Sequence, residues 1–240
     1  MNWQDAYYAL VAKRKRCRIC SESGLTNPVC IEGGIYDSDQ IGPWSCWQGN
    51  LNAEIMVVGQ DWGDVSYFTK WKGLDDPAGN PTNTNLQRLL LKFGIAIKTP
   101  QEPQEHSVFF TNIILCLKNG GLQAPIKDEW LANCSANFFR PLVAIVKPKI
   151  ILTLGKRVSE TILDLYGIPY SKAAPLSHLM NGSPFMLTES THLFPVYHCG
   201  AGGVNRNRSM EKQAEDWGKA AAWFASSFAG EGVRAAHTGL

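Results

Sequence analysis

The chain has 240 residues, and its 45% hydrophobic content is typical of a globular protein with one large or two small α/β domains. Lys and Arg number 23 against 21 for Asp and Glu, so the overall charge does not indicate a nucleic-acid-binding protein. The longest apolar runs are much shorter than the roughly 20 residues that cross a bilayer, and no signal peptide opens the chain. We therefore expect a cytoplasmic protein that does not bind a membrane.

The N-terminal sequence predicts a helix with several aromatic residues, which carries a basic run at residues 13–16 and is followed by Cys17 and Cys20. Residues 21–52 are rich in Gly, Pro, Ser and Asn and follow neither a helical nor a strand period, which predicts an irregular segment over the body of the protein. The chain has seven cysteines, an odd number, and no export signal. The cysteines are therefore expected to be thiols or metal ligands rather than a disulfide framework.

From residue 53 onward, short apolar runs alternate with amphipathic stretches. Buried strands are predicted at 55–58, 108–114, 150–154 and 193–197. Helices are predicted at 85–93, 127–146, 156–166 and beyond 210. This alternation predicts a three-layer αβα sandwich with a central, mostly parallel four-stranded sheet, formed by a single domain over residues 1–240.

Polar residues follow three of these strands. Gln60 and Asp61 come after the first strand, Asn112 lies in the second, and His198 follows the last. Because ligands bind at the carboxyl ends of parallel strands, we expect these side chains to converge at one edge of the sheet. Taken singly, each type of residue also caps helices, closes turns or lies on ordinary surfaces.

Together and in this order, the motifs resemble those of the uracil-DNA glycosylase superfamily, over about residues 17–208. The resemblance implies that Asp61, preceded by Gln60 in the same motif, orients or activates the attacking water. It also implies that Asn112 reads the edge of uracil and that His198 stabilises the departing uracil anion. The expected partner is DNA that contains a damaged or deaminated base, and the expected activity is hydrolysis of the N-glycosidic bond.

The chemistry of this reaction explains these residue types. Cleavage of the bond places positive charge on the sugar and negative charge on the base, so the site needs a carboxylate and a hydrogen-bond donor. A base within a duplex must be flipped out and is then held by stacking and by hydrogen bonds. Trp62 and Phe68 are candidates for the stacking residue. Gly200, Asn205 and Arg206, in the loop after the histidine, are expected to contact DNA.

The cysteine spacing resembles that of the thermophile-type branch, which binds a four-iron, four-sulfur (4Fe-4S) cluster. This resemblance implies that the cluster ligands are Cys17, Cys20, Cys116 and Cys134, and that the cluster clamps residues 1–52 to the α/β body. Under this interpretation the two other N-terminal cysteines are buried thiols. The alternative is a local zinc site that consists of Cys17, Cys20, Cys30 and Cys46.

The chain departs from the family pattern at two positions. Gly63 stands where a related branch has the tyrosine that rejects the methyl group of thymine. Whether this protein excludes thymine is therefore an open question. Cys199 and Gly200 replace a usual Pro-Ser pair, and Cys199 is expected to be an exposed thiol.

Two alternatives of other classes stay open. One is a catalytically inactive nucleic-acid-binding protein that uses the basic run from Lys13 to Arg18 and the arginines at 206 and 208. The other is an unrelated α/β enzyme with a zinc knuckle. In each case we expect a monomer.

Overall fold

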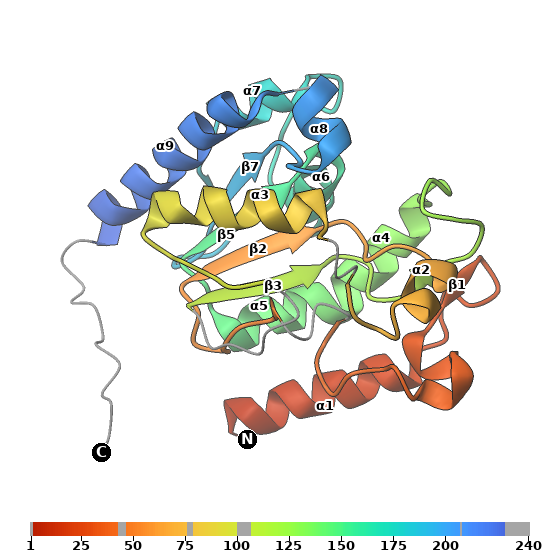
Figure 1. Cartoon of the computed structure of the whole chain (residues 1–240). Coiled ribbons are helices and arrows are strands. Elements are labelled where there is room, and N and C mark those ends of the chain that lie inside the picture. The colour runs from red at the N-terminus through yellow and green to blue at the C-terminus, as the bar shows by residue number, and fades with distance from the viewer. Residues whose placement is uncertain (1, 43–46, 76–78, 100–106, 207, 229–240) are drawn as a thin grey trace, which may run out of the picture.

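The five-stranded central sheet organises the protein. The computed structural model describes residues 2–42, 47–75, 79–99, 107–206 and 208–228, without the side chains of residues 203 and 205. The strands of the sheet follow the order β3-β2-β5-β7-β6. Their bounds are β2 Ile55–Gly59, β3 Val108–Asn112, β5 Ile150–Leu154, β6 Phe185–Met186 and β7 His192–Val196. The four strands β2, β3, β5 and β7 are parallel (Figure 1). The short edge strand β6 is antiparallel to β7.

Helices cover both faces of this sheet, which makes the three predicted layers. Alternate strand residues point to opposite faces. Met56 and Phe109 join the core beneath α1, α4, α5 and α6, whereas Val57 and Phe110 join the core beneath α3 and α9 (Figure 1). The helices are α1 Trp3–Arg16, α2 Val65–Lys70, α3 Pro81–Leu90, α4 Asp128–Cys134, α5 Arg140–Val146, α6 Lys156–Tyr166, α7 Leu176–Asn181, α8 Ala201–Arg206 and α9 Met210–Phe228.

The strand register aligns the loops that carry the predicted site residues. Gly59 lies opposite Asn112 in the β2–β3 pair, and Leu154 lies opposite Val196 in the β5–β7 pair. The loops after all four parallel strands therefore leave the same edge of the sheet.

The prediction of an αβα sandwich is confirmed, with differences in the smaller elements. The sheet has five strands rather than four, because the two-residue strand β6 has too few residues to show a period. A second sheet pairs β1 Leu25–Thr26, within the segment predicted as irregular, with β4 Leu117–Lys118, for which no element was predicted. The predicted strand 108–114 ends at residue 112, and the predicted helix 127–146 contains a π-helical turn at Ser135–Phe139.

No helix within the described ranges has the length and apolar character needed to span a membrane.

Candidate functional site

One cleft at the carboxyl edge of the sheet collects the polar residues predicted from the sequence. Its lining includes Gln60, Asp61, Trp62, Asn112 and His198. These residues come from the loops after β2 and β7 and from the end of β3, which the sheet brings together although 138 positions separate residues 60 and 198 along the chain. The cleft can therefore act as a single chemical site.

Asp61 is held by two side chains. Its Oδ2 accepts a hydrogen bond from Gln60 Nε2 at 2.9 Å, and its Oδ1 lies 3.2 Å from Lys118 Nζ. The side chains of Lys118 and Asp61 are only 5% and 10% exposed. A carboxylate removed from water needs such partners, because an unpaired buried charge is strongly unfavourable. The carboxylate is therefore fixed in the cleft by a lysine that sequence reasoning missed.

Asn112 offers an unused acceptor to the cleft. The residue is 4% exposed, and within the described part of the chain its Oδ1 has no hydrogen-bond partner. Buried amide oxygens are nearly always bonded, so one without a protein partner suits a ligand that donates an N–H.

His198 is held as a neutral donor. Its Nδ1 accepts the Gly200 backbone N–H at 3.0 Å, which places the ring proton on Nε2. Burial lowers the pKa of His198, and the nearby Asp61 charge opposes this shift only in part. The histidine is therefore poised to donate a hydrogen bond from Nε2.

Gly200 makes this arrangement sterically feasible. A Cβ at residue 200 would lie 2.8 Å from both His198 Cε1 and Thr82 Oγ1, which is too close for any other residue without rearrangement. The backbone of Gly200 therefore lies close to His198 and to α3.

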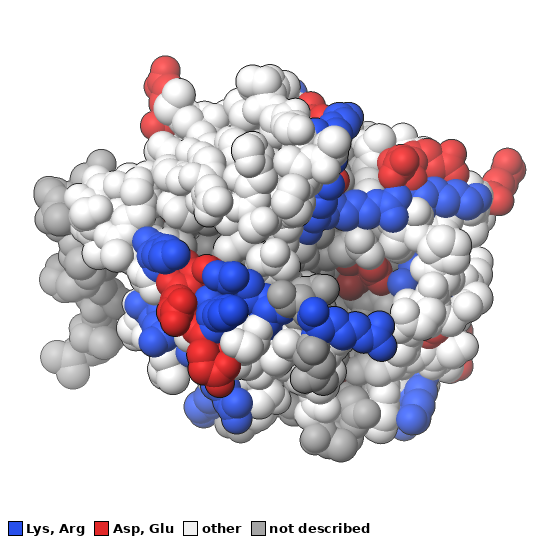
Figure 2. All heavy atoms as spheres, turned by 90° about the horizontal axis from the view of Figure 1, so that it is seen from above, with Lys and Arg blue, Asp and Glu red and all other residues white. Residues whose placement is uncertain are grey.

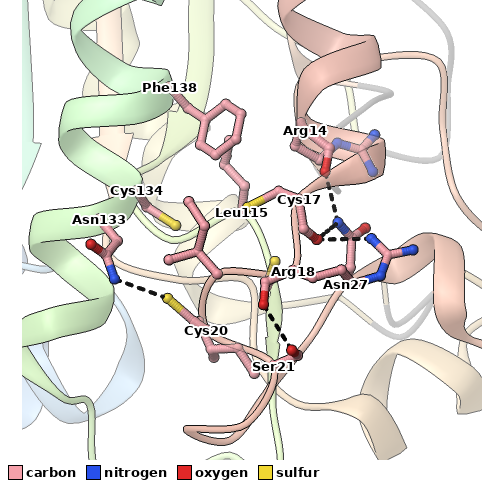
Figure 3. A pocket seen from close by; sticks show the side chains of 13 residues that line it. Arg14, Cys17, Arg18, Cys20, Ser21, Asn27, Leu115, Asn133, Cys134 and Phe138 are labelled. Atoms are coloured by element: carbon pink, nitrogen blue, oxygen red, sulfur yellow. Dashed lines mark hydrogen bonds between the residues drawn. The ribbon is translucent and has the colours of Figure 1, made fainter.

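A second cavity is lined by Cys17, Cys20, Cys116 and Cys134 (Figure 3). Cys17 and Cys20 follow α1, Cys116 precedes β4, and Cys134 ends α4. None of the four is in a disulfide. The cavity thus joins three distant parts of the chain.

The donor set of this cavity fits a metal centre ligated by sulfur. Burial raises the pKa of the Cys134 thiol to about 12 and raises that of Cys116 further. The remaining lining is largely apolar, and Asn133 Nδ2 donates a hydrogen bond to Cys20 Sγ at 3.5 Å. Across the described ranges, no three His, Cys, Asp or Glu side chains are close enough to hold a single metal ion. Four cysteine thiols are the number and type of ligand that a 4Fe-4S cluster takes.

Comparison with known proteins identifies the family. The sequence profile of the Uracil DNA glycosylase superfamily matches residues 46–225. The chain belongs to this superfamily. A curated relative, the Type-4 uracil-DNA glycosylase of Sulfurisphaera tokodaii, is 28% identical over 163 residues, which are 67% of this chain and 66% of the relative. The chain thus spans just under two thirds of that relative's length.

In this superfamily member, Phe68 does not face the cleft. The side chain is 1% exposed and packs with Ile31 and Leu117 in a separate core cluster, so the prediction that it stacks on a base is wrong. Trp62 packs against the same cluster but also lines the cleft. Tyr67, one residue before Phe68, lines the cleft and donates its hydroxyl hydrogen bond to Asp75.

The arginines after His198 have different surroundings. Arg206 ends α8 and is exposed, whereas the side chain of Asn205 lies outside the described residues. Arg208 forms a bidentate salt bridge with Asp216 at 2.7 and 2.8 Å. The guanidinium of Arg208 is therefore engaged within the protein, and its role in gripping phosphates stays a prediction.

Two cationic residues at the start of α6 were not predicted. Lys156 and Arg157 line the cleft and are partly exposed, although each also pairs with a carboxylate, Glu160 at 3.4 Å and Asp128 at 2.6 Å. In the view from above, Lys and Arg side chains lie on both sides of a hollow in the surface (Figure 2). Such cations favour approach of a phosphate backbone. The signal in the sequence was their position directly after a strand of the parallel sheet.

The basic run near the N-terminus is largely structural. Arg14 is 1% exposed and bonds both oxygens of Asp37, at 2.7 and 2.8 Å. Lys15 pairs with Asp39 at 2.6 Å. The charges of Arg14 and Lys15 are therefore paired within the protein, whereas Lys13, Arg16 and Arg18 are exposed.

The other cysteines differ from expectation. Cys199 is fully buried rather than exposed, and burial raises its pKa to about 12, which disfavours the thiolate form. Cys30 is exposed rather than buried and does not line the cysteine cavity. Cys46 lies outside the described residues. Cys30 therefore does not share a cavity with Cys17 and Cys20, as the alternative zinc site requires.

Proposed function

We propose that the protein is a DNA glycosylase that excises uracil or a related deaminated base in base-excision repair. The proposal rests on one observation, that Gln60, Asp61, Asn112 and His198 line a single cleft in a chain of this superfamily. The protein acts on DNA, and we expect it to do so as a monomer.

In the proposed reaction, Asp61 orients a water molecule towards C1′ of the sugar. The C1′–N bond of the nucleotide breaks as the water oxygen bonds to C1′, and the bonding electron pair leaves with the base. The Asp61 carboxylate stabilises the positive charge on the sugar and accepts a proton from the water. Gln60 keeps the carboxylate in place through its bond to Oδ2.

His198 and Asn112 act on the leaving base. The Nε2–H of neutral His198 donates to a base oxygen, where negative charge gathers as the bond breaks. The unpartnered Oδ1 of Asn112 accepts an N–H from the flipped base, and its amide NH₂ donates to a neighbouring oxygen. A base that presents both an N–H and a carbonyl on one edge, as uracil does, matches this amide.

Cys17, Cys20, Cys116 and Cys134 would hold a 4Fe-4S cluster. When bound, the cluster supplies metal–thiolate bonds that clamp the N-terminal segment, residues 1–52, to the rest of the single domain. This role is structural, and the proposed hydrolysis uses only side chains of the cleft.

The activity is tested with oligonucleotides that contain uracil, hypoxanthine or xanthine, by measuring abasic sites after incubation with purified protein. We expect excision of at least one of these bases and a large loss of rate in Asp61→Asn, because the amide cannot accept the proton. Equal inactivity of both proteins on every base would refute the enzymatic function.

A further inference from the structure

Lys118 is the charged partner of the proposed catalytic carboxylate. It is the second residue of β4, 4% exposed, and lines the cleft. Its Nζ lies 3.2 Å from Asp61 Oδ1 and donates to Leu122 O at 2.8 Å. The ammonium therefore joins the loop after β2 to the turn after β4.

The backbone of Lys118 is fixed close to the loop that it serves. Its N–H donates to Gly63 O at 3.1 Å, and it forms a parallel bridge with Asp64. On its other side it pairs with Leu25 of β1. Because β1 holds one side of this residue and an isolated bridge to Asp64 holds the other, its side chain approaches Asp61 from a defined direction.

Lys118 and Gln60 together determine the orientation of the carboxylate. Each contacts a different oxygen of Asp61, so rotation of the carboxylate would break at least one contact. A carboxylate oxygen has two lone-pair directions, so each oxygen keeps one for water or for the sugar.

We propose that Lys118 is a positioning residue, which holds the Asp61 carboxylate towards the sugar of the bound nucleotide. This inference rests on the proposed function. A purely structural role would affect only the stability of the protein. The proposed role also predicts that the charge of Lys118 fixes the position of the Asp61 carboxylate, which acts on the reacting sugar.

The first test is the excision rate of Lys118→Met, Lys118→Arg and Lys149→Met on uracil-containing DNA. Lys149 is the matched control, since it forms an ion pair with Glu54 at 2.7 Å at the opposite edge of the sheet. We expect Lys118→Met to lower kcat about 100-fold with KM changed less than about twofold. Lys118→Arg should recover part of kcat, and Lys149→Met should match the wild type.

The second test does not require turnover. It compares the binding of DNA with a cationic pyrrolidine in place of the sugar with the binding of DNA with a neutral tetrahydrofuran. We expect the wild type and Lys149→Met to bind the cationic analogue more tightly, and Lys118→Met to lose this preference while it still binds the neutral analogue. Lys118→Gln, which is uncharged and too short to reach both partners, serves the same comparison if Lys118→Met does not fold.

The outcomes separate the two proposals. A wild type that prefers the cationic analogue through Lys118 but excises no base would refute the glycosylase function and support the positioning role. A Lys118→Met variant with wild-type kcat and wild-type preference would overturn the positioning role, as would a wild type that shows no preference.

Discussion

At the scale of single residues, His198 shows how local contacts determine a protonation state. The Gly200 N–H occupies Nδ1, and burial opposes a positive charge on the ring. Protonation would add a second N–H to the ring, at Nδ1, where its hydrogen would face the Gly200 N–H. The same contacts that make His198 a neutral donor therefore make the fold sensitive to acid.

We predict that this histidine lowers stability at acidic pH. Its pKa in the folded chain lies below the ordinary value of 6.5. Below pH 6.5 or so, the unfolded chain thus binds more protons at this site, and the free energy of unfolding falls as the pH falls towards the lowered pKa. Urea unfolding across this range should show a weaker pH dependence in His198→Gln than in the wild type.

His192 must be separated from this effect, because burial also lowers its pKa. His192→Gln removes that second contribution and leaves that of His198. A double variant with the same slope as the wild type would contradict the assignment to these two histidines.

At the scale of elements, Asn27 ties the end of α1 to the loop that carries the first two cysteines. The residue is 4% exposed, and its Nδ2 donates to Arg14 O at 2.7 Å and to Cys17 O at 3.0 Å. Its Oδ1 accepts from Val29 N at 3.3 Å. One buried amide thus satisfies backbone groups on both sides of the cysteine loop.

Asn27→Ala should therefore destabilise the protein. One buried and one partly buried hydrogen bond to a carbonyl group would be lost, which we expect to cost about 2 kcal/mol in the free energy of unfolding. The exposed Asn52 provides the control, and Asn52→Ala should change stability by less than about 0.5 kcal/mol. Chemical denaturation of both variants checks this, and equal stability of the two would contradict the role of Asn27.

The success of sequence reasoning also differs between elements. The strands at 55, 108, 150 and 193 were predicted because each is a continuous apolar run, buried on both faces. The β1–β4 pair was missed because two-residue strands have no period, and pairing across more than 90 positions leaves no local pattern. That pair carries Lys118, so the missed element explains the missed residue.

At the scale of the whole molecule, the four cavity cysteines connect the N-terminal segment to the body of the protein. Cys17 and Cys20 belong to that segment, whereas Cys116 and Cys134 lie beside β4 and in α4. A metal centre held by all four would replace the weak contacts of an irregular segment with metal–thiolate bonds.

We predict that the purified protein is brown and contains iron and sulfide. Cys116→Ser should lose iron and visible absorbance and should unfold at lower temperature, because one ligand is removed. Cys30→Ser should keep all three properties, since Cys30 is exposed and away from the cavity. A colourless protein with stoichiometric zinc would refute the iron cluster.

The sequence by itself determined the sandwich, the positions of its long strands along the chain and the edge at which Gln60, Asp61, Asn112 and His198 meet, because apolar runs and their alternation with amphipathic stretches are local patterns. Only the tertiary structure decided what each side chain faces. In that structure Phe68 packs into a core, whereas Tyr67 lines the cleft. Arg208 pairs with Asp216, and Lys118 pairs with Asp61. The physical reason is that these outcomes depend on contacts between distant segments, and the direction of a single side chain leaves no periodic trace in the sequence.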